Sequence, residues 1–219
     1  MENSRIYNKW PFAKEGLPFI CAGWLVALVF ALVGLSYIAI LTGLISLFTC
    51  FFFRDPERHN RAKEGEVLTP ADGKILGIER LNAEQSPSGE PALKISIFMS
   101  IFNVHVNRAP AGGTIKKISY LPGRFFAASL DKASELNERN IITLETTESR
   151  PIVFIQIAGL IARRIACWVK EGDRVAMGQR FGLIRFGSRL EVYLPHGSEI
   201  RVIAGQKVKA GITVIGNLP

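Results

Sequence analysis

The most extended pattern in the chain is an apolar one near its N-terminus. Thirty-eight consecutive residues, 16–53, carry no charge and are mostly Leu, Val, Ile, Phe and Ala. As one unbroken helix they would measure roughly 57 Å, against about 30 Å for the hydrocarbon core of a bilayer. The length therefore favours a helical hairpin that turns near residues 34–36. A single tilted span is the alternative, and a buried helix of a soluble core is the third.

The charges around this stretch bear on its topology. Basic residues stand on both sides of it: Arg5, Lys9 and Lys14 before, and Arg54, Arg58, Arg61 and Lys63 after. Because positive flanks favour the cytoplasmic side of a membrane, we expect both ends of the hairpin to face the cytoplasm. The stretch is too long for a signal peptide and has no small-residue cleavage pattern. The sequence thus predicts a membrane anchor over residues 1–53 and a second domain over 54–219, which excludes a simple cytosolic enzyme.

After the apolar stretch the pattern becomes typical of β-strands. Short runs rich in Ile, Val and Phe recur between Gly and Pro residues, at 74–78, 93–99, 114–120, 141–145, 152–158, 180–185, 189–194 and 212–215. Runs of this length and composition indicate strands. A helical turn or two is expected only within 125–139 and 159–165. The second domain is therefore predicted to be mainly β (α+β).

One internal repeat sharpens the fold class. Segments 169–178 and 202–211 share the pattern VxxGxxVxxG, 33 residues apart. Glycine at each turn permits positive φ, and the valines point into a core. The spacing is similar to that of the half-barrel hairpins in biotinyl and lipoyl carrier domains. A pair of such units predicts a flattened β-barrel or sandwich made of two similar halves.

Composition and charge narrow the partners. Hydrophobic residues make up 48% of the chain and charged residues 21%, which excludes a disordered protein. The net charge is +8, of which residues 54–219 carry +7, dispersed along the sequence. No basic run resembles a nucleic-acid arm, so no nucleic-acid partner is expected. The positive surface either attracts the domain to anionic lipid headgroups or serves only solubility.

The sequence lacks the motifs that several kinds of binding site and catalysis require. The three histidines, His59, His105 and His196, form no HxH or HExxH pattern, and the cysteines form no CxxC pair. We therefore expect no metal site and no disulfide, and a reducing compartment. Cys167 is interpreted as a small buried hydrophobic residue. The P-loop, GxGxxG and GxSxG motifs are absent, which removes nucleotide chemistry and the hydrolase nucleophile elbow.

Three polar positions inside apolar strands remain as candidates. Asp72 lies at a turn before a strand, His105 stands among hydrophobic neighbours, and Gly187-Ser188 interrupts an otherwise strand-like run. Each has a structural explanation: a turn, a satisfied core histidine and a bulge. Taken singly, none of them would support a functional claim.

Together these positions can be recognised. TPADGKI, FMSIFNVHVNRAPAGG, ASLDKASELNERN and FGSRLEVYLP occur in order after the apolar anchor and FFFRDPER. The chain resembles phosphatidylserine decarboxylase, and more narrowly its short form, which includes archaetidylserine decarboxylase-like proteins. The resemblance covers the chain from the anchor to Pro219.

The resemblance implies a pyruvoyl cofactor made from the chain itself. Ser188 Oγ would attack the Gly187 carbonyl, and elimination and hydrolysis would leave an N-terminal pyruvoyl group at position 188. The products would be a β chain, 1–187, and an α chain, 188–219. Condensation of the ketone with the substrate amine gives a Schiff base that accepts the electrons released as CO₂ departs. Phosphatidylserine would thus become phosphatidylethanolamine, a step of phospholipid biosynthesis.

The resemblance also assigns roles to neighbouring residues. Asp72 matches the family's acidic residue for self-cleavage, as base or orienter, and His105 matches the first histidine of a His-x-x-His motif in the longer enzymes. Arg108 stands where the second histidine would be, so either His105 serves both cleavage and decarboxylation or Asp72 acts without a histidine relay. Arg108, together with Asn103, is a candidate for substrate binding; a structural ion pair is the alternative for Arg108. Arg189 follows the serine, where the long form has a small hydroxyl residue.

Two other interpretations compete with this one. One is a membrane-anchored lipoyl- or biotinyl-like binding module, although no lysine stands at a hairpin tip between the repeats. The other is a membrane-anchored peptidase, which the missing histidine pairs disfavour. We expect the enzyme at the cell membrane, with its catalytic domain on the cytoplasmic face. The lipid tails, diacyl or isoprenoid, and association into a homo-oligomer are left open.

Overall fold

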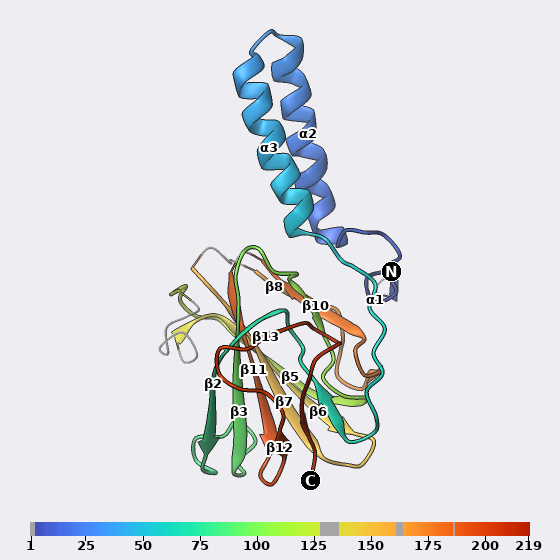
Figure 1. The fold of residues 1–219 in the computed structure, drawn as a ribbon, viewed down its shortest axis with the longest axis vertical. Helices are drawn as coiled ribbons and strands as arrows, with labels where there is room; N and C mark the ends of the chain where they lie inside the picture. Colours follow the sequence, from blue (N-terminus) through green and yellow to red (C-terminus); the bar gives the residue numbers. More distant parts are fainter. Residues whose placement is uncertain (1–2, 128–135, 161–163, 186) are drawn as a thin grey trace. The chain divides into compact units, whose positions relative to one another are not determined.

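The computed structural model describes residues 3–127, 136–160, 164–185 and 187–219. It divides into two compact units, Met1–Glu57 and Arg58–Pro219. The first unit is helical and the second is built from strands (Figure 1). The helical elements are α1 (Asn3–Ile6), the 3₁₀ turn η1 (Lys14–Gly16), α2 (Leu17–Leu32) and α3 (Ser36–Phe52).

Helices α2 and α3 form an antiparallel hairpin. They are joined through Gly34, whose φ of 80° suits a residue without a side chain. Gly23 in α2 faces Ser46 in α3 so closely that a Cβ atom would overlap its hydroxyl. Most large apolar side chains of the two helices are exposed. Helices that are apolar on all sides are typical of membrane segments, and the 19-residue stretch Lys14–Leu32 is long enough to cross a bilayer.

The ends of the hairpin are tied together by backbone and amide contacts. Ala13 N donates to Phe53 O at 2.8 Å, and Asp55 N donates to Pro11 O at 2.8 Å. The buried Asn8 amide donates to Asp55 Oδ2 at 3.1 Å. These bonds satisfy polar groups where the chain enters and leaves the hairpin.

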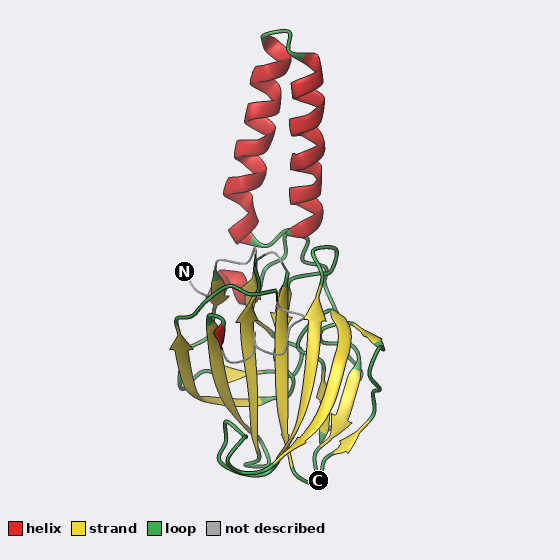
Figure 2. Ribbon diagram, turned by 90° about the vertical axis from the view of Figure 1, so that its left-hand side faces the viewer, coloured by secondary structure: helices red, strands yellow, loops and turns green. Residues whose placement is uncertain are grey.

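The second unit confirms the prediction of a mainly β protein. Strands account for 38% of the structure and helices for 19%. The largest sheet is antiparallel and has eight strands in the order β13-β2-β3-β11-β7-β6-β5-β9, curled into a half-barrel (Figure 2). Its strands, in the same order, are β13 (Lys207–Val208), β2 (Gly73–Leu81), β3 (Ala92–Met99), β11 (Ser188–Pro195), β7 (Pro151–Ala158), β6 (Arg139–Thr146), β5 (Gly113–Leu121) and β9 (Arg174–Val175).

Two three-stranded sheets complete the unit. One has the order β4-β10-β8 and the other β1-β14-β12. Their strands are β4 (Val106–Arg108), β10 (Arg180–Ile184), β8 (Ile165–Cys167), β1 (Glu66–Leu68), β14 (Val214–Asn217) and β12 (Glu199–Ile200). Each of the eight predicted apolar runs overlaps a strand, whereas the shortest strands had no sequence pattern of their own.

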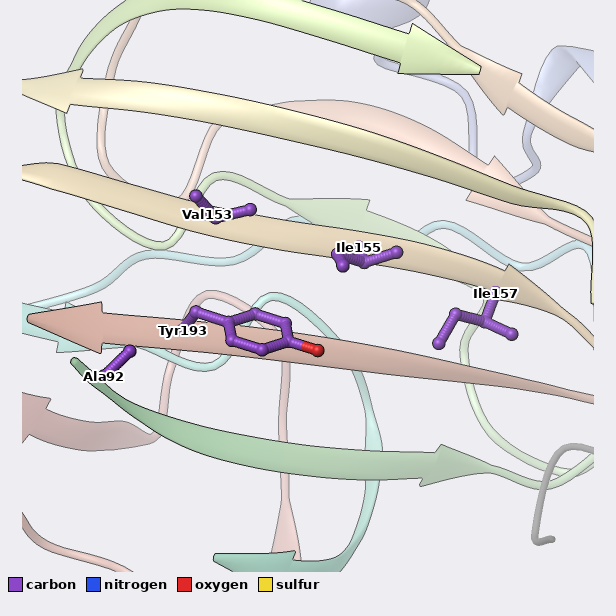
Figure 3. Packing of buried hydrophobic residues seen from close by; sticks show 5 residues of the cluster. All are labelled: Ala92, Val153, Ile155, Ile157 and Tyr193. Atoms are coloured by element: carbon purple, nitrogen blue, oxygen red, sulfur yellow. The ribbon is translucent and has the colours of Figure 1, made fainter. Parts of the chain in front are cut away.

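Both faces of the large sheet bury apolar side chains. On one face Phe154 of β7 meets Phe181 of β10, with ring centroids 4.9 Å apart, so the smaller sheet packs against the larger one. On the other face a second cluster spans β3, β7 and β11, and consists of Ala92, Val153, Ile155, Ile157 and Tyr193 (Figure 3). Burial on both faces explains why these strands read as nearly continuous apolar runs.

The two repeats occupy corresponding places at opposite ends of the large sheet. The repeat 202–211 contains β13, which pairs with β2, and the repeat 169–178 contains β9, which pairs with β5. We call these two regions the β2–β13 edge and the β5–β9 edge. Gly205 N donates to Ile75 O at one edge and Gly172 N donates to Ile115 O at the other, both at 2.8 Å. The fold is therefore two similar halves, as predicted.

Another pair of similar segments, which sequence inspection missed, begins the strands β2 and β5 that pair with β13 and β9. Residues 70–75 read PADGKI and residues 110–115 read PAGGTI. Gly73 and Gly113 each lie against a neighbouring carbonyl, of Phe98 and of Glu145, which a Cβ atom would overlap. Each strand then has a bulge two to four residues later, at 75–77 in β2 and at 115–117 in β5. The close approach requires glycine at both positions.

Two local predictions remain, the helical turns and the bulge at Gly187-Ser188. The helical turns expected within 125–139 and 159–165 fall partly on 128–135 and 161–163, which lie outside the described residues, and Ile165 begins strand β8. The Gly187-Ser188 pair is not a bulge inside one strand. Strand β10 ends at Ile184 and β11 begins at Ser188, so Gly187 belongs to the connection between two strands.

Candidate active site

Ser188 opens the central strand of the large sheet. It pairs with Met99 of β3 on one side and with Ala158 of β7 on the other. The residue is fully buried, and its hydroxyl donates to Met99 Sδ at 3.3 Å. A thioether is a weak acceptor, so this hydroxyl is not committed to a strong hydrogen bond.

The preceding residue holds an unusual backbone conformation. Gly187 has a φ of 66°, in the left-handed region that side chains disfavour. No other atom lies within 4 Å of a Cβ placed there, so the conformation, and not lack of space, calls for glycine. The Gly187 N–H donates to His105 Nε2 at 3.4 Å. The Gly187-Ser188 bond thus follows a turn that a histidine contacts directly.

The hydrogen bonds of His105 define its tautomer. Its ring is fully buried, just before β4, and Nδ1 lies 3.0 Å from Asn103 O. Since Nε2 accepts from Gly187, the proton resides on Nδ1 and is donated to the Asn103 carbonyl. His105 O also accepts from Ile184 N at 3.4 Å. A neutral histidine with its Nε2 lone pair toward Gly187 is suited to act as a base.

Asn103 organises the turn that carries this histidine. Its Oδ1 accepts from Ser100 N at 2.9 Å and from Ser100 Oγ at 2.8 Å. A side-chain amide that closes a short turn in this way fixes the backbone that follows it. The Asn103 contacts therefore position His105, and substrate binding by Asn103 stays a prediction.

Asp72 is held by a different set of partners. Arg58 Nη1 and Nη2 donate to its two carboxylate oxygens at 2.5 and 2.9 Å, and Ala210 N donates to Oδ1 at 2.7 Å. Arg58 Nη1 also donates to Ala210 O at 2.7 Å. These described bonds hold the carboxylate between Arg58 and the repeat 202–211. They suit an orienting role better than that of a free base.

Arg108 lies where the two repeats meet. It is buried, and Nη1 donates to Gly178 O at 3.1 Å. The same side chain packs on Gly211, where a Cβ atom would come within 2.7 Å of Arg108 Cδ. Gly178 and Gly211 are the last glycines of the two repeats, so Arg108 joins the halves. An anion-binding role for it stays a prediction.

A chain of buried amides behind Ser188 was missed by sequence reasoning. Asn107 Nδ2 lies 3.8 Å from Met99 Sδ, Gln156 Nε2 donates to Asn107 Oδ1 at 2.9 Å, and Asn140 Nδ2 donates to Gln156 Oε1 at 3.1 Å. The available signal was a glutamine within an otherwise apolar strand. Buried amides that satisfy one another fix the positions of their neighbours, here the sulfur that meets Ser188.

Cys167 lies close to Asn140, the last of these buried amides. Its thiol donates to Val169 O at 3.5 Å, and burial raises the pKa of the thiol above its ordinary value. The sulfur therefore stays protonated at neutral pH and is a poor nucleophile. The side chain is only half-buried, so the interpretation of Cys167 as a small buried residue holds in part.

The residues around Ser188 fit the formation of a pyruvoyl group. The precursor serine is present, the residue before it is a glycine with positive φ, and a neutral histidine contacts the amide between β10 and β11. Ser188 and His105 are fully buried, so a reactive carbonyl formed at position 188 would be shielded from bulk water.

Comparison with known proteins agrees with this geometry. Residues 45–216 match the family model described as phosphatidylserine decarboxylase. The chain is 53% identical over 205 residues to the phosphatidylserine decarboxylase proenzyme of Syntrophus aciditrophicus, covering 93% of this chain and 96% of that protein. It is 46% identical to the proteins of the same name from Desulfotalea psychrophila and Geotalea uraniireducens, in each case covering 95% of this chain and 97% of the relative. The chain therefore belongs to the phosphatidylserine decarboxylase family and is a carboxy-lyase.

Proposed function

We propose that this protein decarboxylates phosphatidylserine to phosphatidylethanolamine with a pyruvoyl group made by self-cleavage at Gly187-Ser188. The single observation that carries the proposal is the contact between the Gly187 N–H and His105 Nε2, next to a buried serine hydroxyl. The name proenzyme, given to the relatives, supports a chain that is processed before it acts.

Self-cleavage uses groups of the chain alone. Ser188 Oγ attacks the Gly187 carbonyl carbon, the peptide C–N bond breaks, and the Ser188 nitrogen takes up a proton as an ester forms. Removal of the Ser188 Cα proton then expels the Gly187 carboxylate. Water hydrolyses the resulting enamine and releases ammonia. The positive φ of Gly187 and its lack of a side chain assist the attack, because the carbonyl is unhindered.

His105 is the base that we assign to the proton transfers. Its Nδ1–H tautomer turns the Nε2 lone pair toward Gly187, where it exchanges the Gly187 N–H for the hydroxyl proton, and the Asn103 carbonyl stabilises the imidazolium that results. Asp72 is assigned an orienting role and not that of the base, because Arg58 and the Ala210 N–H hold its carboxylate. Of the two possibilities left by the missing second histidine, we favour His105 serving both cleavage and decarboxylation.

The pyruvoyl group supplies an electron sink for the loss of CO₂. The two chains, 1–187 and 188–219, stay together after cleavage, because the shorter one contributes β11 between β3 and β7 as well as β12, β13 and β14. Separation would break the hydrogen bonds on both sides of β11, which is buried along most of its length.

The apolar hairpin keeps the enzyme at its substrate. Phosphatidylserine does not leave the bilayer, and helices α2 and α3 present apolar side chains suited to lipid. The basic residues before and after the hairpin favour the cytoplasmic side of the cell membrane.

Denaturing mass spectrometry of the purified full-length chain tests the cleavage. We expect two chains, with a C-terminal piece of 32 residues blocked at its N-terminus. Ser188→Ala should remain one chain and release no CO₂. The matched control is Ser198→Ala, because Ser198 also follows a glycine of positive φ, Gly197. An active enzyme that is a single intact chain would overturn the proposal.

His105→Gln separates the two roles of the histidine. If His105 serves both steps, this variant neither cleaves nor decarboxylates phosphatidylserine. Normal cleavage with lost decarboxylation would restrict it to the second step, and our assignment of the cleavage base would be wrong.

A further inference from the structure

A cavity at the β2–β13 edge lies beside the site described above and has not been given a function so far. It has a volume of about 500 Å³ and lies at the end of strand β3. Its walls combine three lysines with aromatic and amide groups: Lys74, Lys207, Lys209, Phe98, Phe102 and Asn103. A space of this size with apolar walls and a few converging polar groups is typical of a ligand site.

The lysines give the cavity an excess of positive charge. Lys74 and Lys207 are directly opposite each other in the β2–β13 pair, and Lys209 follows two residues later. Like charges at directly opposed positions destabilise a sheet. Asp72 is the carboxylate in the lining, but it already accepts from Nη1 and Nη2 of Arg58. The arrangement therefore favours an anionic ligand.

The fold itself does not require these lysines. The corresponding cavity at the β5–β9 edge has a volume of about 590 Å³ and uses the equivalent strands. There Thr114 stands in place of Lys74 and Ala176 in place of Lys209, whereas Arg174 keeps the positive charge of Lys207 and Glu145 is part of the lining. The same backbone is thus stable without two of the three positive charges, so the excess of lysines calls for another explanation.

The cavity shares a wall with the candidate active site. Phe98 and Ser100 line it, and between them Met99 contacts the Ser188 hydroxyl. The lining residue Asn103 supplies the carbonyl that holds His105. A ligand in the cavity therefore lies along the turn 100–105, which leads to the Gly187-Ser188 bond.

We propose that this cavity binds the phosphodiester of the substrate lipid. The proposal rests on the function proposed above. Lys74, Lys207 and Lys209 would neutralise the phosphate, to which lysine is suited as a point charge. Phe98 and Phe102 would contact the glycerol and the first carbons of the tails. The phosphate keeps its charge during decarboxylation, so it can anchor the lipid while the serine carboxylate is lost.

Binding to the uncleaved protein tests the cavity independently of catalysis. The probe is dihexanoyl phosphatidylethanolamine, a short-chain lipid, titrated by calorimetry into full-length Ser188→Ala in neutral detergent. We expect replacement of all three lysines, K74Q/K207Q/K209Q, to weaken binding by at least about tenfold. The matched control is K116Q/K117Q/R174Q, which removes the same charge from the β5–β9 edge. Equal binding by the two triple variants would overturn the proposal.

Two further probes distinguish the ligand. Dihexanoylglycerol lacks the phosphate and should bind with no dependence on the lysines. Inorganic phosphate should bind at least about tenfold more weakly than the lipid, because it lacks the apolar contacts. Phosphate binding as tight as the lipid would reduce the cavity to a free-anion site and contradict the assignment to a lipid.

Kinetics on the cleaved enzyme provide the second arm. With dihexanoyl phosphatidylserine below its micellar concentration, the lysine variant should cleave normally and show KM raised at least about tenfold, with kcat changed less than about threefold. If KM rose only with substrate in anionic vesicles, the lysines would serve surface attraction, and the proposal would fail. A wild-type protein that neither cleaves nor decarboxylates would instead refute the proposed function, while the binding result would stand.

Discussion

The two edges of the large sheet share a backbone and differ in chemistry. At the β2–β13 edge Arg58 donates to Ala210 O in the repeat 202–211. At the β5–β9 edge Asn60 donates to Met177 O in the repeat 169–178. Asp72 stands at the first edge where the second has Gly112. The buried Arg58–Asp72 ion pair is thus found at one of two equivalent frameworks, and a neutral hydrogen bond and a glycine take its place at the other. The repeat therefore determines the scaffold, and a few substituted positions determine the chemistry of the site.

Removing Arg58 should have the largest effect on this asymmetry. Arg58→Gln leaves the nearly buried Asp72 carboxylate without its charged partner, and we expect a loss of about 3 kcal/mol of unfolding free energy. Asn60→Ala, at the equivalent place, should lose about 1 kcal/mol because a neutral hydrogen bond is removed. Urea unfolding of the full chain in detergent measures both.

A double variant checks the cause. R58Q/D72N removes both charges, so it should be more stable than Arg58→Gln alone. If the single and double variants were equally stable, the ion pair would not be the source of the effect, and the contrast between the edges would lose its main support.

Gly73 in PADGKI and the equivalent Gly113 in PAGGTI test whether the scaffold is symmetric. Gly73→Ala and Gly113→Ala each force a Cβ atom against a backbone carbonyl, so each should cost about 2–3 kcal/mol. Only Gly73→Ala displaces Phe98, next to Met99, and it should slow self-cleavage at temperatures where both variants remain folded. Equal cleavage rates, measured by mass spectrometry over time, would show that the edge does not act on Ser188.

The amide chain between the halves should have a smaller effect. Gln156→Leu leaves Asn107 and Asn140 without their shared partner, and we expect a loss of about 1–2 kcal/mol. Because Asn107 contacts the Met99 sulfur, cleavage should also slow, by less than the effect of His105→Gln. A cleavage rate unchanged from the wild type would mean that Ser188 is positioned by the strand pairing alone.

Exposed ion pairs at the two edges should matter least. Lys116 pairs with Glu145 at the β5–β9 edge, and Lys94 pairs with Glu79 on β3 and β2. We expect Lys116→Gln and Glu79→Gln each to change stability by less than about 0.5 kcal/mol, because water screens such pairs. Neither should alter cleavage. A large loss in either variant would reveal a contribution of surface charge that the comparison of the edges omits.

Much of the fold could be read from the sequence because it depends on local periodicity. The apolar runs of β3, β7 and β11 are long and buried on both faces, and each was predicted. The short strands β9 and β13 have two residues each and were seen only as parts of the VxxGxxVxxG repeat. Strands this short are specified by their partners, so no local pattern could mark them.

The candidate site was predicted unevenly for the same reason. Ser188, His105 and Asp72 were selected by resemblance, and the structure brings His105 to the residue before Ser188. It places Asp72 with Arg58, a partner that sequence reasoning had counted only as a flanking charge. Nothing in the local sequence joins positions 58, 72 and 210, because their contact depends on how the repeat 202–211 pairs with strand β2.

From the sequence alone came the apolar helical stretch, the β domain of two halves and a serine in a recognisable motif. Those features follow from hydrophobic periodicity and from the glycines that tight turns demand. The tertiary structure alone decided the partner of each polar group. It placed the Nε2 atom of His105 next to the Gly187 N–H, paired Asp72 with Arg58, and brought Lys74 together with two lysines of the repeat 202–211 around one cavity. Such contacts join residues that are distant in sequence, and only the folded sheet fixes their distances.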